Sequence, residues 1–599
     1  LAEALLRVHD RDTVDCLIAE KIHMGQWESH IGNSAEILVN AASVGLSITR
    51  KILANQQGIE IESKNWFAKL IQRLGEPVVR GATLQAMKFM GQQYVLGRDI
   101  KEASKRGRRG NVDGTRFSFD MLGEGARTYE TGAKYYASYL SAIRSIGKGN
   151  HEKNVYAVDG ISVKLSALHP RYEFSRHQLV MDELLPDVLA LAVEAKKFNI
   201  GFTIDAEEAA RLDIELDVFA CLAFAPELAG WNGLGFVLQA YQKRALSVVD
   251  WLVELAKSSD RKLMVRLVKG AYWDAEIKHA QEMGFGEFTV FTRKAHTDLS
   301  YQVCAGKLLD NRDVIYPQFA THNAYTVALI MEMAGNDMSS FEFQRLHGMG
   351  DLLYTQVSEI IGHALPLRVY APVGVHRDLL PYLVRRLLEN GANGSFVNQF
   401  LDGQIPPANI VQSVESTIEK AKGKRNTQIP LAQDIFNAFG EKRNNSRGID
   451  VDDPLALDAL LQKVKSFAQT TWQAGPIING LMLNDNAYPL YSPADTTYVV
   501  GHCSDAKPLD VEIAMTSAFA AQPDWQALPV EQRATIMEGV ADLLEAQMEE
   551  LTTLISFEAG RTLNDGISEV REAVDFCRYY ALQIRDLVSD SPLQPKLTQ

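Results

Sequence analysis

The feature that most restricts the fold of this chain is an alternation of two kinds of segment that begins at Arg116. Short runs rich in β-branched and aromatic residues recur, and each is followed by a longer stretch with apolar residues at helical spacing. Eight such units predict an α/β fold of the (βα)8, TIM-barrel type over residues 111–403. A doubly wound open sheet is the alternative, because strand number alone does not prove closure. The runs are RFSFDML (116–122), ISVKLSA (161–167), FTIDAE (202–207), FVLQAY (236–241), LMVRLVK (263–269), YPQFATH (316–322), FEFQRLH (341–347) and LRVYAPV (367–373).

Three further regions flank the predicted barrel. Residues 1–110 place apolar residues at helical spacing and are expected to form a helical arm and an α domain. Residues 404–455 are polar and broken by Pro and Gly, which indicates a linker or a short helical connector. Residues 456–599 contain a hairpin-like segment at 487–502 and long amphipathic stretches. The basic run 101–109 (KEASKRGRR) is interpreted as a solvated loop, because Gly and Ser interrupt it.

Composition limits the classes of partner. The net charge of −14 disfavours nucleic-acid binding as the main function, since phosphate contacts require clustered Lys and Arg. The five cysteines are never closely paired, which fits a reducing compartment and excludes a CxxC motif. No apolar run reaches membrane-spanning length and no signal peptide is evident, so a cytoplasmic protein is expected. Because Leu1 is not Met, it is not expected to be the native N-terminus.

Polar side chains gather at the ends of the predicted strands. Reactive residues of a TIM barrel lie at the carboxyl ends of its strands, and an unpaired charge in a buried strand is strongly unfavourable. For any one of these residues a satisfied structural role is the more frequent explanation, but their convergence on one face favours a ligand site. They are Glu124, Lys164, Asp205, Gln239, Arg266, Lys269, Thr321, His322 and Tyr370.

The helix predicted after the eighth strand carries two adjacent arginines. Asp378 is suited to cap this helix, and Pro381 falls in its first turn, where proline is tolerated. Arg385, Arg386 and Glu389 lie away from its apolar stripe. Adjacent arginines usually face solvent, but a helix at this position can lean over the barrel mouth. Two guanidinium groups there would suit bidentate capture of a small carboxylate.

Most motifs for common cofactors are missing from the predicted barrel. No GxGxxG opens a βαβ unit, and no HExxH, paired-cysteine or aspartate-loop spacing indicates a metal, so none is expected. Arg266 and Lys269 carry charge suited to an anionic flavin ring, and Gly270 would let a pyrophosphate approach the backbone. His322 could add a phosphate donor, and Trp273 a stacking face.

These segments, in this order, closely resemble the proline dehydrogenase domain of the bacterial, bifunctional proline utilisation A family. The resemblance extends over residues 110–402, and the upstream helices resemble the arm and helical domain of that family. It implies an FAD enzyme that oxidises L-proline to pyrroline-5-carboxylate and passes the electrons to a quinone. The motifs are ISVKLSALHPRY, FTIDAEEAARL, FVLQAYQKRA, MVRLVKGAYWDAE, FATHNA, FEFQRLHGMGD, LRVYAPVG and LVRRLLENGAN.

The resemblance assigns a proline site to the barrel mouth. Arg385, Arg386 and Lys164 would bind the proline carboxylate, and Asp205 would lie close to the reacting centre. Glu124 would pair with the first arginine when the site closes. The substrate positions are Glu124, Lys164, Tyr272, Tyr370, Arg385 and Arg386, and the catalytic positions are Lys164, Asp205, Arg266 and Tyr272.

The resemblance also assigns an FAD site, with Arg266 near the flavin N5. Positioning explains most of the rate of hydride transfer, because the substrate carbon must lie near van der Waals contact with N5. The amine must be neutral for hydride to leave, and no residue is assigned as acceptor of its proton. The FAD positions are Ala206, Gln239, Arg266, Lys269, Gly270, Trp273, Thr321, His322 and Glu389.

A quinone acceptor implies peripheral association with the inner face of the bacterial plasma membrane. The sequence itself shows no membrane-binding surface, and it leaves a homo-oligomer open.

The last region resembles the start of an aldehyde dehydrogenase domain, in YSPADTTYVVGH, DWQALPVEQRATIMEGVADLLE and EAGRTLNDGISEVREAVDFCRYYA. The nucleophilic cysteine of that family lies further downstream than Gln599, and Cys577 is interpreted as a packing residue. The chain is therefore expected to be a fragment without pyrroline-5-carboxylate dehydrogenase activity. The full-length protein would oxidise glutamate semialdehyde with NAD. No nucleic-acid-binding domain is expected in this chain.

Two other functions stay open. Lys164 at a strand end would suit a barrel aldolase that forms a Schiff base. A barrel kept only as a scaffold is the second alternative, and the intact set Lys164, Asp205, Arg385 and Arg386 argues against it.

Overall fold

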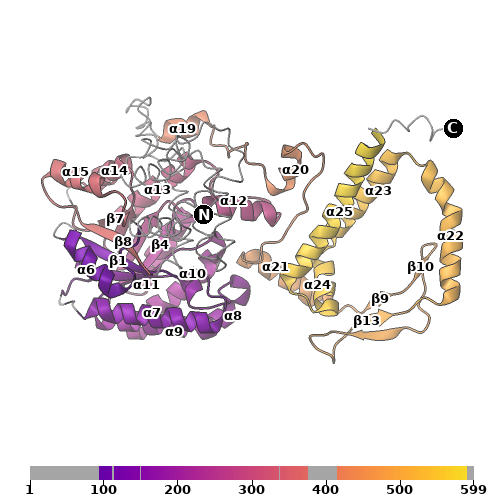
Figure 1. Cartoon of the computed structure of the whole chain (residues 1–599), viewed down its shortest axis with the longest axis horizontal. Helices are drawn as coiled ribbons and strands as arrows, with labels where there is room; N and C mark the ends of the chain where they lie inside the picture. Colours follow the sequence, from indigo (N-terminus) through magenta and orange to yellow (C-terminus); the bar gives the residue numbers. More distant parts are fainter. Residues whose placement is uncertain are drawn as a thin grey trace, which may run out of the picture.

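The computed structural model describes residues 94–110, 114–148, 150, 152–335, 337–374 and 414–589. Its eight parallel strands follow one another around a closed barrel. The barrel is completed by pairing of β1 with β8, which are next to each other in Figure 1. Closure confirms the predicted (βα)8 fold and excludes the open sheet. The strands are β1 (Arg116–Met121), β2 (Gly160–Val163), β3 (Gly201–Ile204), β4 (Leu234–Gln239), β5 (Leu263–Val268), β6 (Ile315–Ala320), β7 (Glu342–Leu346) and β8 (Leu367–Val373).

Successive residues of a barrel strand face opposite sides, as β1 illustrates. Phe117 and Phe119 belong to the main hydrophobic core. Ser118 and Asp120 alternate with them and bond groups of other strands, such as the Ser162 hydroxyl, whose oxygen lies 2.8 Å from that of Ser118. Branched aliphatic side chains normally fill such an interior. A polar interior in this barrel therefore indicates a site.

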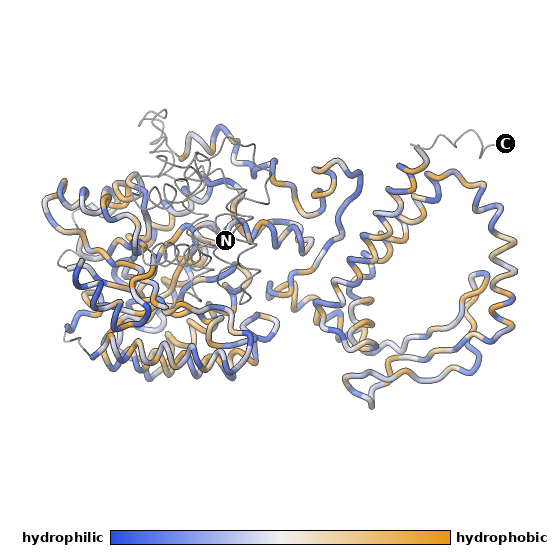
Figure 2. The backbone as a smooth tube through the Cα atoms, viewed as in Figure 1, coloured by the Kyte–Doolittle hydropathy of each residue, from blue (hydrophilic) through white to orange (hydrophobic). Residues whose placement is uncertain are grey.

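Amphipathic helices cover the outside of the barrel. Figure 2 shows hydrophobic and hydrophilic residues alternating along α7, whose first turn is capped by Thr128. Asn323 caps α14 in the same way, by accepting from the Thr326 amide. The helices are α7 (Tyr129–Gly147), α8 (His177–Leu179), α9 (Leu185–Lys197), α10 (Leu212–Phe224), α11 (Ala245–Ser258), α12 (Trp273–Glu282), α13 (Lys294–Asp310), α14 (Ala324–Ala334) and α15 (Asp351–Ile361).

The basic run interpreted as a loop is in fact helix α6 (Ile100–Gly110), so that expectation is wrong. Small residues allow this helix to pack closely against β1. Ala103 and Gly107 are buried, and a Cβ added at Gly107 would lie 2.8 Å from the Phe117 ring, so the helix can approach β1 closely. Its Lys and Arg side chains stay largely outside this contact. The helices predicted within residues 1–93 lie outside the described residues.

The region after the barrel has a smaller core of its own, which includes Leu460, Ala541 and Val574. Within it α23 and α25 lie side by side (Figure 1). The hairpin expected at 487–502 is present, since β12 and β13 pair antiparallel. The elements are α19 (Val414–Lys420), α20 (Ile435–Ala438), α21 (Pro454–Phe467), β9 (Trp472–Ala474), β10 (Ile477–Ile478), β11 (Leu481–Met482), β12 (Tyr488–Tyr491), β13 (Val499–Cys503), α22 (Pro508–Ala527), α23 (Val530–Ala546), α24 (Met548–Ala559) and α25 (Leu563–Ser589).

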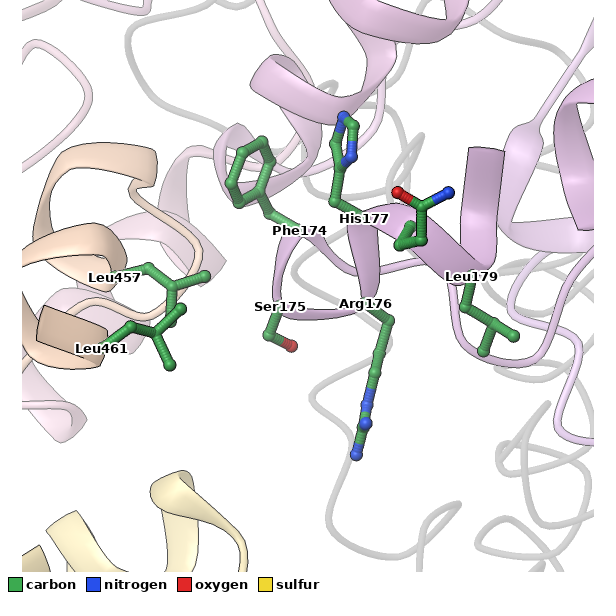
Figure 3. A pocket seen from close by; sticks show the side chains of 8 residues that line it. Phe174, Ser175, Arg176, His177, Leu179, Leu457 and Leu461 are labelled. Carbon is green, nitrogen blue, oxygen red and sulfur yellow. The ribbon is translucent and has the colours of Figure 1, made fainter. Parts of the chain in front are cut away.

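An apolar pocket lies where the connection between β2 and α9 approaches α21. Figure 3 shows Leu457 and Leu461 on one side and Phe174 and Leu179 on the other. No residue predicted for the proline or FAD site lines it. Among the residues that the structure describes, every helix is too short or too polar to span a lipid bilayer. The same residues contain no group of His, Cys, Asp and Glu that could hold a metal.

Candidate functional site at the barrel mouth

The carboxyl ends of the strands bring charged residues to one mouth. Lys164 directly follows β2, Asp205 directly follows β3, and Arg266 and Tyr370 lie in β5 and β8. Lys164, Asp205 and Arg266 are only 6%, 6% and 4% exposed. Charges so far from water are tolerated only when they are paired and hydrogen-bonded. The pairs they form define the site.

Lys164 pairs mainly with Asp120 of β1, a residue that the strand-end pattern does not single out. Its Nζ donates to both Asp120 carboxylate oxygens, at 2.8 and 2.9 Å, and Asp120 is fully buried. Asp205 Oδ2 lies 3.8 Å from the same nitrogen. Burial alone would lower the pKa of Lys164, but the two carboxylates outweigh it and raise that pKa well above the usual lysine value. Lys164 is therefore a cation at neutral pH.

Asp205 connects this pair to the opposite wall. Its Oδ1 accepts from Arg266 Nη1 at 2.6 Å, and its Oδ2 accepts from the Tyr370 hydroxyl at 2.6 Å. The Arg266 guanidinium lies 5.1 Å from the centre of the Tyr370 ring. Burial, with the carboxylates of Asp120 and Asp205, raises the pKa of Tyr370 well above normal, so its hydroxyl stays a donor. Asp120, Lys164, Asp205, Arg266 and Tyr370 thus form one network, the mouth cluster.

The Arg266 guanidinium is not fully paired within the described part of the protein. Its Nη2 donates to the hydroxyls of Ser118 and Ser162, at 3.1 and 2.8 Å. Its Nε is buried and has no hydrogen-bond partner among the described residues. A buried donor left unpaired costs about 1–3 kcal/mol, so an acceptor from a bound ligand would be stabilising here. A ring nitrogen such as flavin N5 fits this requirement.

Gly270 and Gln239 lie at neighbouring strand ends. Gly270 has φ of +130°, and a Cβ there would lie 2.5 Å from the Tyr241 ring, so packing alone requires glycine. Its part in binding a pyrophosphate stays a prediction. The Gln239 amide donates to the Glu207 carbonyl at 3.1 Å and accepts from Gln242 at 2.8 Å.

Other predicted FAD positions hydrogen-bond within the protein. His322 Nε2 accepts from the Leu346 amide at 3.0 Å, which places the ring proton on Nδ1 and makes that atom the donor. Lys269 pairs with Asp298, while burial lowers the pKa of Lys269. The two others are Trp273, which donates to the Phe291 carbonyl, and Thr321, which accepts from the Asn323 amide.

The remaining positions lie at the rim or outside the described residues. Glu124, Ala206 and Tyr272 are half-buried, in the loop after β1, after Asp205 and directly before α12 respectively. Arg385, Arg386 and Glu389 fall within residues 375–413, which the structure does not describe.

Three family models match the chain. The model described as Proline dehydrogenase matches residues 103–399, and the one described as Aldehyde dehydrogenase family matches residues 482–596. A third, described as DNA-binding domain of Proline dehydrogenase, matches residues 1–94.

Curated relatives and solved structures extend these matches. "Bifunctional protein PutA" of Klebsiella aerogenes is 46% identical over 98% of this chain and 45% of its own length. Proline dehydrogenase 1 of Bacillus subtilis strain 168 is 27% identical over 51% of this chain and 88% of its own length. A crystal structure of proline utilization A from Bradyrhizobium japonicum superposes with a TM-score of 0.74 at 45% identity, covering 98% of this chain and 55% of that one. The chain thus spans about half the length of the PutA relatives it matches.

The match at residues 1–94 overturns the expectation that this chain has no nucleic-acid-binding domain. The whole-chain charge of −14 was a poor guide, because residues 1–94 contain ten Lys and Arg against ten Asp and Glu. The acidic excess therefore lies elsewhere in the chain and does not describe this region.

Proposed function

This chain is a homologue of the bifunctional PutA proteins and contains a proline dehydrogenase domain, and we propose that it oxidises L-proline to pyrroline-5-carboxylate with FAD. The observation that supports this best is the mouth cluster, which holds two buried cations, Lys164 and Arg266. The Arg266 Nε is a buried donor that no described residue pairs with. We propose that a quinone is the final electron acceptor, and that the protein reaches this quinone by associating peripherally with the membrane. Residues 482–596 would belong to a second, NAD-dependent domain acting on glutamate semialdehyde.

The chain's own residues would position and orient the substrate. Bound FAD would supply a two-electron acceptor, held by Arg266, Gln239, Lys269, Gly270 and His322. Lys164 would bind the proline carboxylate as a fixed positive charge. The mouth cluster has no net formal charge, because the two cations Lys164 and Arg266 balance the carboxylates of Asp120 and Asp205. Because both carboxylates are engaged, the site would not hold the proline amine in its protonated form, which cannot release hydride.

The charge of Lys164 argues against the aldolase alternative. A Schiff-base lysine needs a lowered pKa to be a nucleophile, whereas the pKa of Lys164 is raised. We therefore expect borohydride to trap no carbonyl substrate on Lys164, as measured by the intact mass of the protein after reduction. An adduct on Lys164 would contradict the dehydrogenase proposal.

The direct test is proline:quinone reductase activity of the full chain, with and without added FAD. We expect a yellow protein that reduces a soluble quinone analogue only when proline is present. Absence of both flavin absorbance and activity would overturn the proposal.

Arg385→Met and Arg386→Met are each expected to raise the KM for proline about tenfold, the size of a lost charge-assisted hydrogen bond. FAD absorbance per chain should not change. Arg244→Met is the matched control, since Arg244 pairs with Asp213 and has no assigned role in the site. An unchanged KM in both site variants would refute the carboxylate clamp.

A further inference from the structure

Glu124 lies in a loop whose shape the local sequence leaves free. It is flanked by Gly123 and Gly125, with φ of +150° and +61°. Glycine adopts such angles without penalty but also has many other conformations available. Contacts from outside the loop must therefore select the observed conformation.

Two of those contacts come from one residue, Ser166, just beyond β2. The Gly125 amide donates to the Ser166 hydroxyl oxygen at 3.0 Å, and the Ala126 amide donates to the Ser166 carbonyl at 2.7 Å. Ser166 is 8% exposed, so water competes little for these bonds. Gly125 and Ala126, the two residues that follow Glu124, are thus both hydrogen-bonded to Ser166.

Ser166 is in turn fixed by Glu207, which follows β3. The Ser166 amide donates to Glu207 Oε1 at 3.0 Å, and the Ser166 hydroxyl donates to Oε2. Because the hydroxyl hydrogen points to the carboxylate, the oxygen lone pairs are free to accept from Gly125. The negative charge also polarises the hydroxyl and strengthens that acceptance.

The burial of Glu207 is unfavourable in itself. Glu207 is 6% exposed, and burial, with help from Glu208, raises its pKa to about 7. A neutral side chain would be buried at this position with a lower free-energy cost, so packing alone does not explain why a carboxylate is present. The charged and titratable groups around it are Lys164, Tyr172, Glu208 and Glu215.

We propose that Glu207 is a positioning residue of the proline site: acting through Ser166, it holds the loop that carries Glu124 in place at the barrel mouth. The loop directly follows β1, whose Asp120 belongs to the mouth cluster, and Glu124 adds to the effects that raise the pKa of Lys164. This role rests on the proposed proline oxidation, because it assigns Glu207 to substrate binding in that reaction.

Glu207→Gln and Ser166→Ala in the full chain test the proposal. The glutamine amide would donate to the serine hydroxyl and turn the hydroxyl hydrogen toward Gly125. We expect KM for proline to rise about fivefold in each variant, the size of one net hydrogen bond, with kcat within about twofold. Amide hydrogen exchange at Gly125 and Ala126 should become faster. Glu276→Gln is the matched control, because Glu276 is equally buried and burial likewise raises its pKa to about 7, yet it bonds Ala209 and Tyr241.

The pH dependence separates positioning from simple folding. Below about pH 7 protonated Glu207 is expected to resemble glutamine, so the ratio of KM in Glu207→Gln to that in wild type should fall toward one as pH falls. Proline ionisation cancels in this ratio. Unchanged exchange at Gly125 overturns the proposal whether or not the chain oxidises proline. Faster exchange with an unchanged KM in an active enzyme also overturns it, whereas an inactive wild type refutes the proposed function instead.

Discussion

Replacing Asp120 with asparagine is expected to lower kcat/KM for proline about 100-fold, equivalent to about 3 kcal/mol. Asparagine keeps the shape of the side chain but removes the charge that pairs with Lys164 at 2.8 Å. Asp205 does not replace it, because the Asp205 Oδ2 atom lies 3.8 Å from the Lys164 Nζ atom, which is beyond hydrogen-bond distance. The lysine would then lose both its fixed position and part of its charge.

The same substitution should change the pH profile of kcat/KM. Asp120 is the first of the groups that raise the pKa of Lys164 against the lowering effect of burial, so its removal lowers that pKa. Loss of activity on the alkaline side should therefore begin at a lower pH in the variant than in the wild type. Asp213→Asn, which removes a surface carboxylate, is the control. A decrease below about threefold with an unmoved alkaline limb would contradict the role of Asp120.

The barrel was predictable because its strands are short, separated and rich in β-branched and aromatic residues. Each observed strand overlaps its predicted run, as β5 (Leu263–Val268) does for the run 263–269. Closure was not predictable, because it depends on the pairing of β1 with β8, whose residues lie far apart in sequence. The helix α6 was not predicted, because a glycine such as Gly107 disfavours a helix. The close contact with Phe117 that requires this glycine cannot be seen in the sequence.

The site was predictable only in part, for a related reason. Lys164 and Asp205 stand at strand ends, where barrel geometry places reactive groups. Asp120 stands within RFSFDML and alternates with two phenylalanines, which is also the pattern of a strand with one face in solvent. Alternation cannot distinguish a polar barrel interior from water. The aspartate could have been found by asking which buried anion pairs with Lys164.

Glu342→Gln is expected to lower the free energy of unfolding by about 3 kcal/mol, because it leaves a buried arginine without its counter-charge. Glu342 begins β7, at the opposite end of the barrel from the mouth cluster, and Arg368 lies at the start of β8. Arg368 Nε and Nη2 donate to the two Glu342 oxygens at 2.6 and 3.1 Å, and both residues are 2% exposed. Arg368 also donates to the carbonyls of Val158 and Tyr156, at 2.7 and 3.0 Å, so it cannot move out to water without breaking those bonds.

The measurement is the urea midpoint followed by circular dichroism, together with the KM for proline. Asp213→Asn again serves as the control, because it breaks the more exposed ion pair with Arg244 and should cost at most about 1 kcal/mol. Glu342→Gln should leave KM near the wild-type value below the unfolding range, since no hydrogen bond or ion pair among the described residues links Glu342 to the mouth cluster. A loss below about 1 kcal/mol would show that the buried pair is not what holds β7 and β8 together at this end. A large rise in KM with unchanged stability would instead show that the pair contributes to substrate binding. That result would contradict the expectation that one end of the barrel carries the chemistry and the other end the stability.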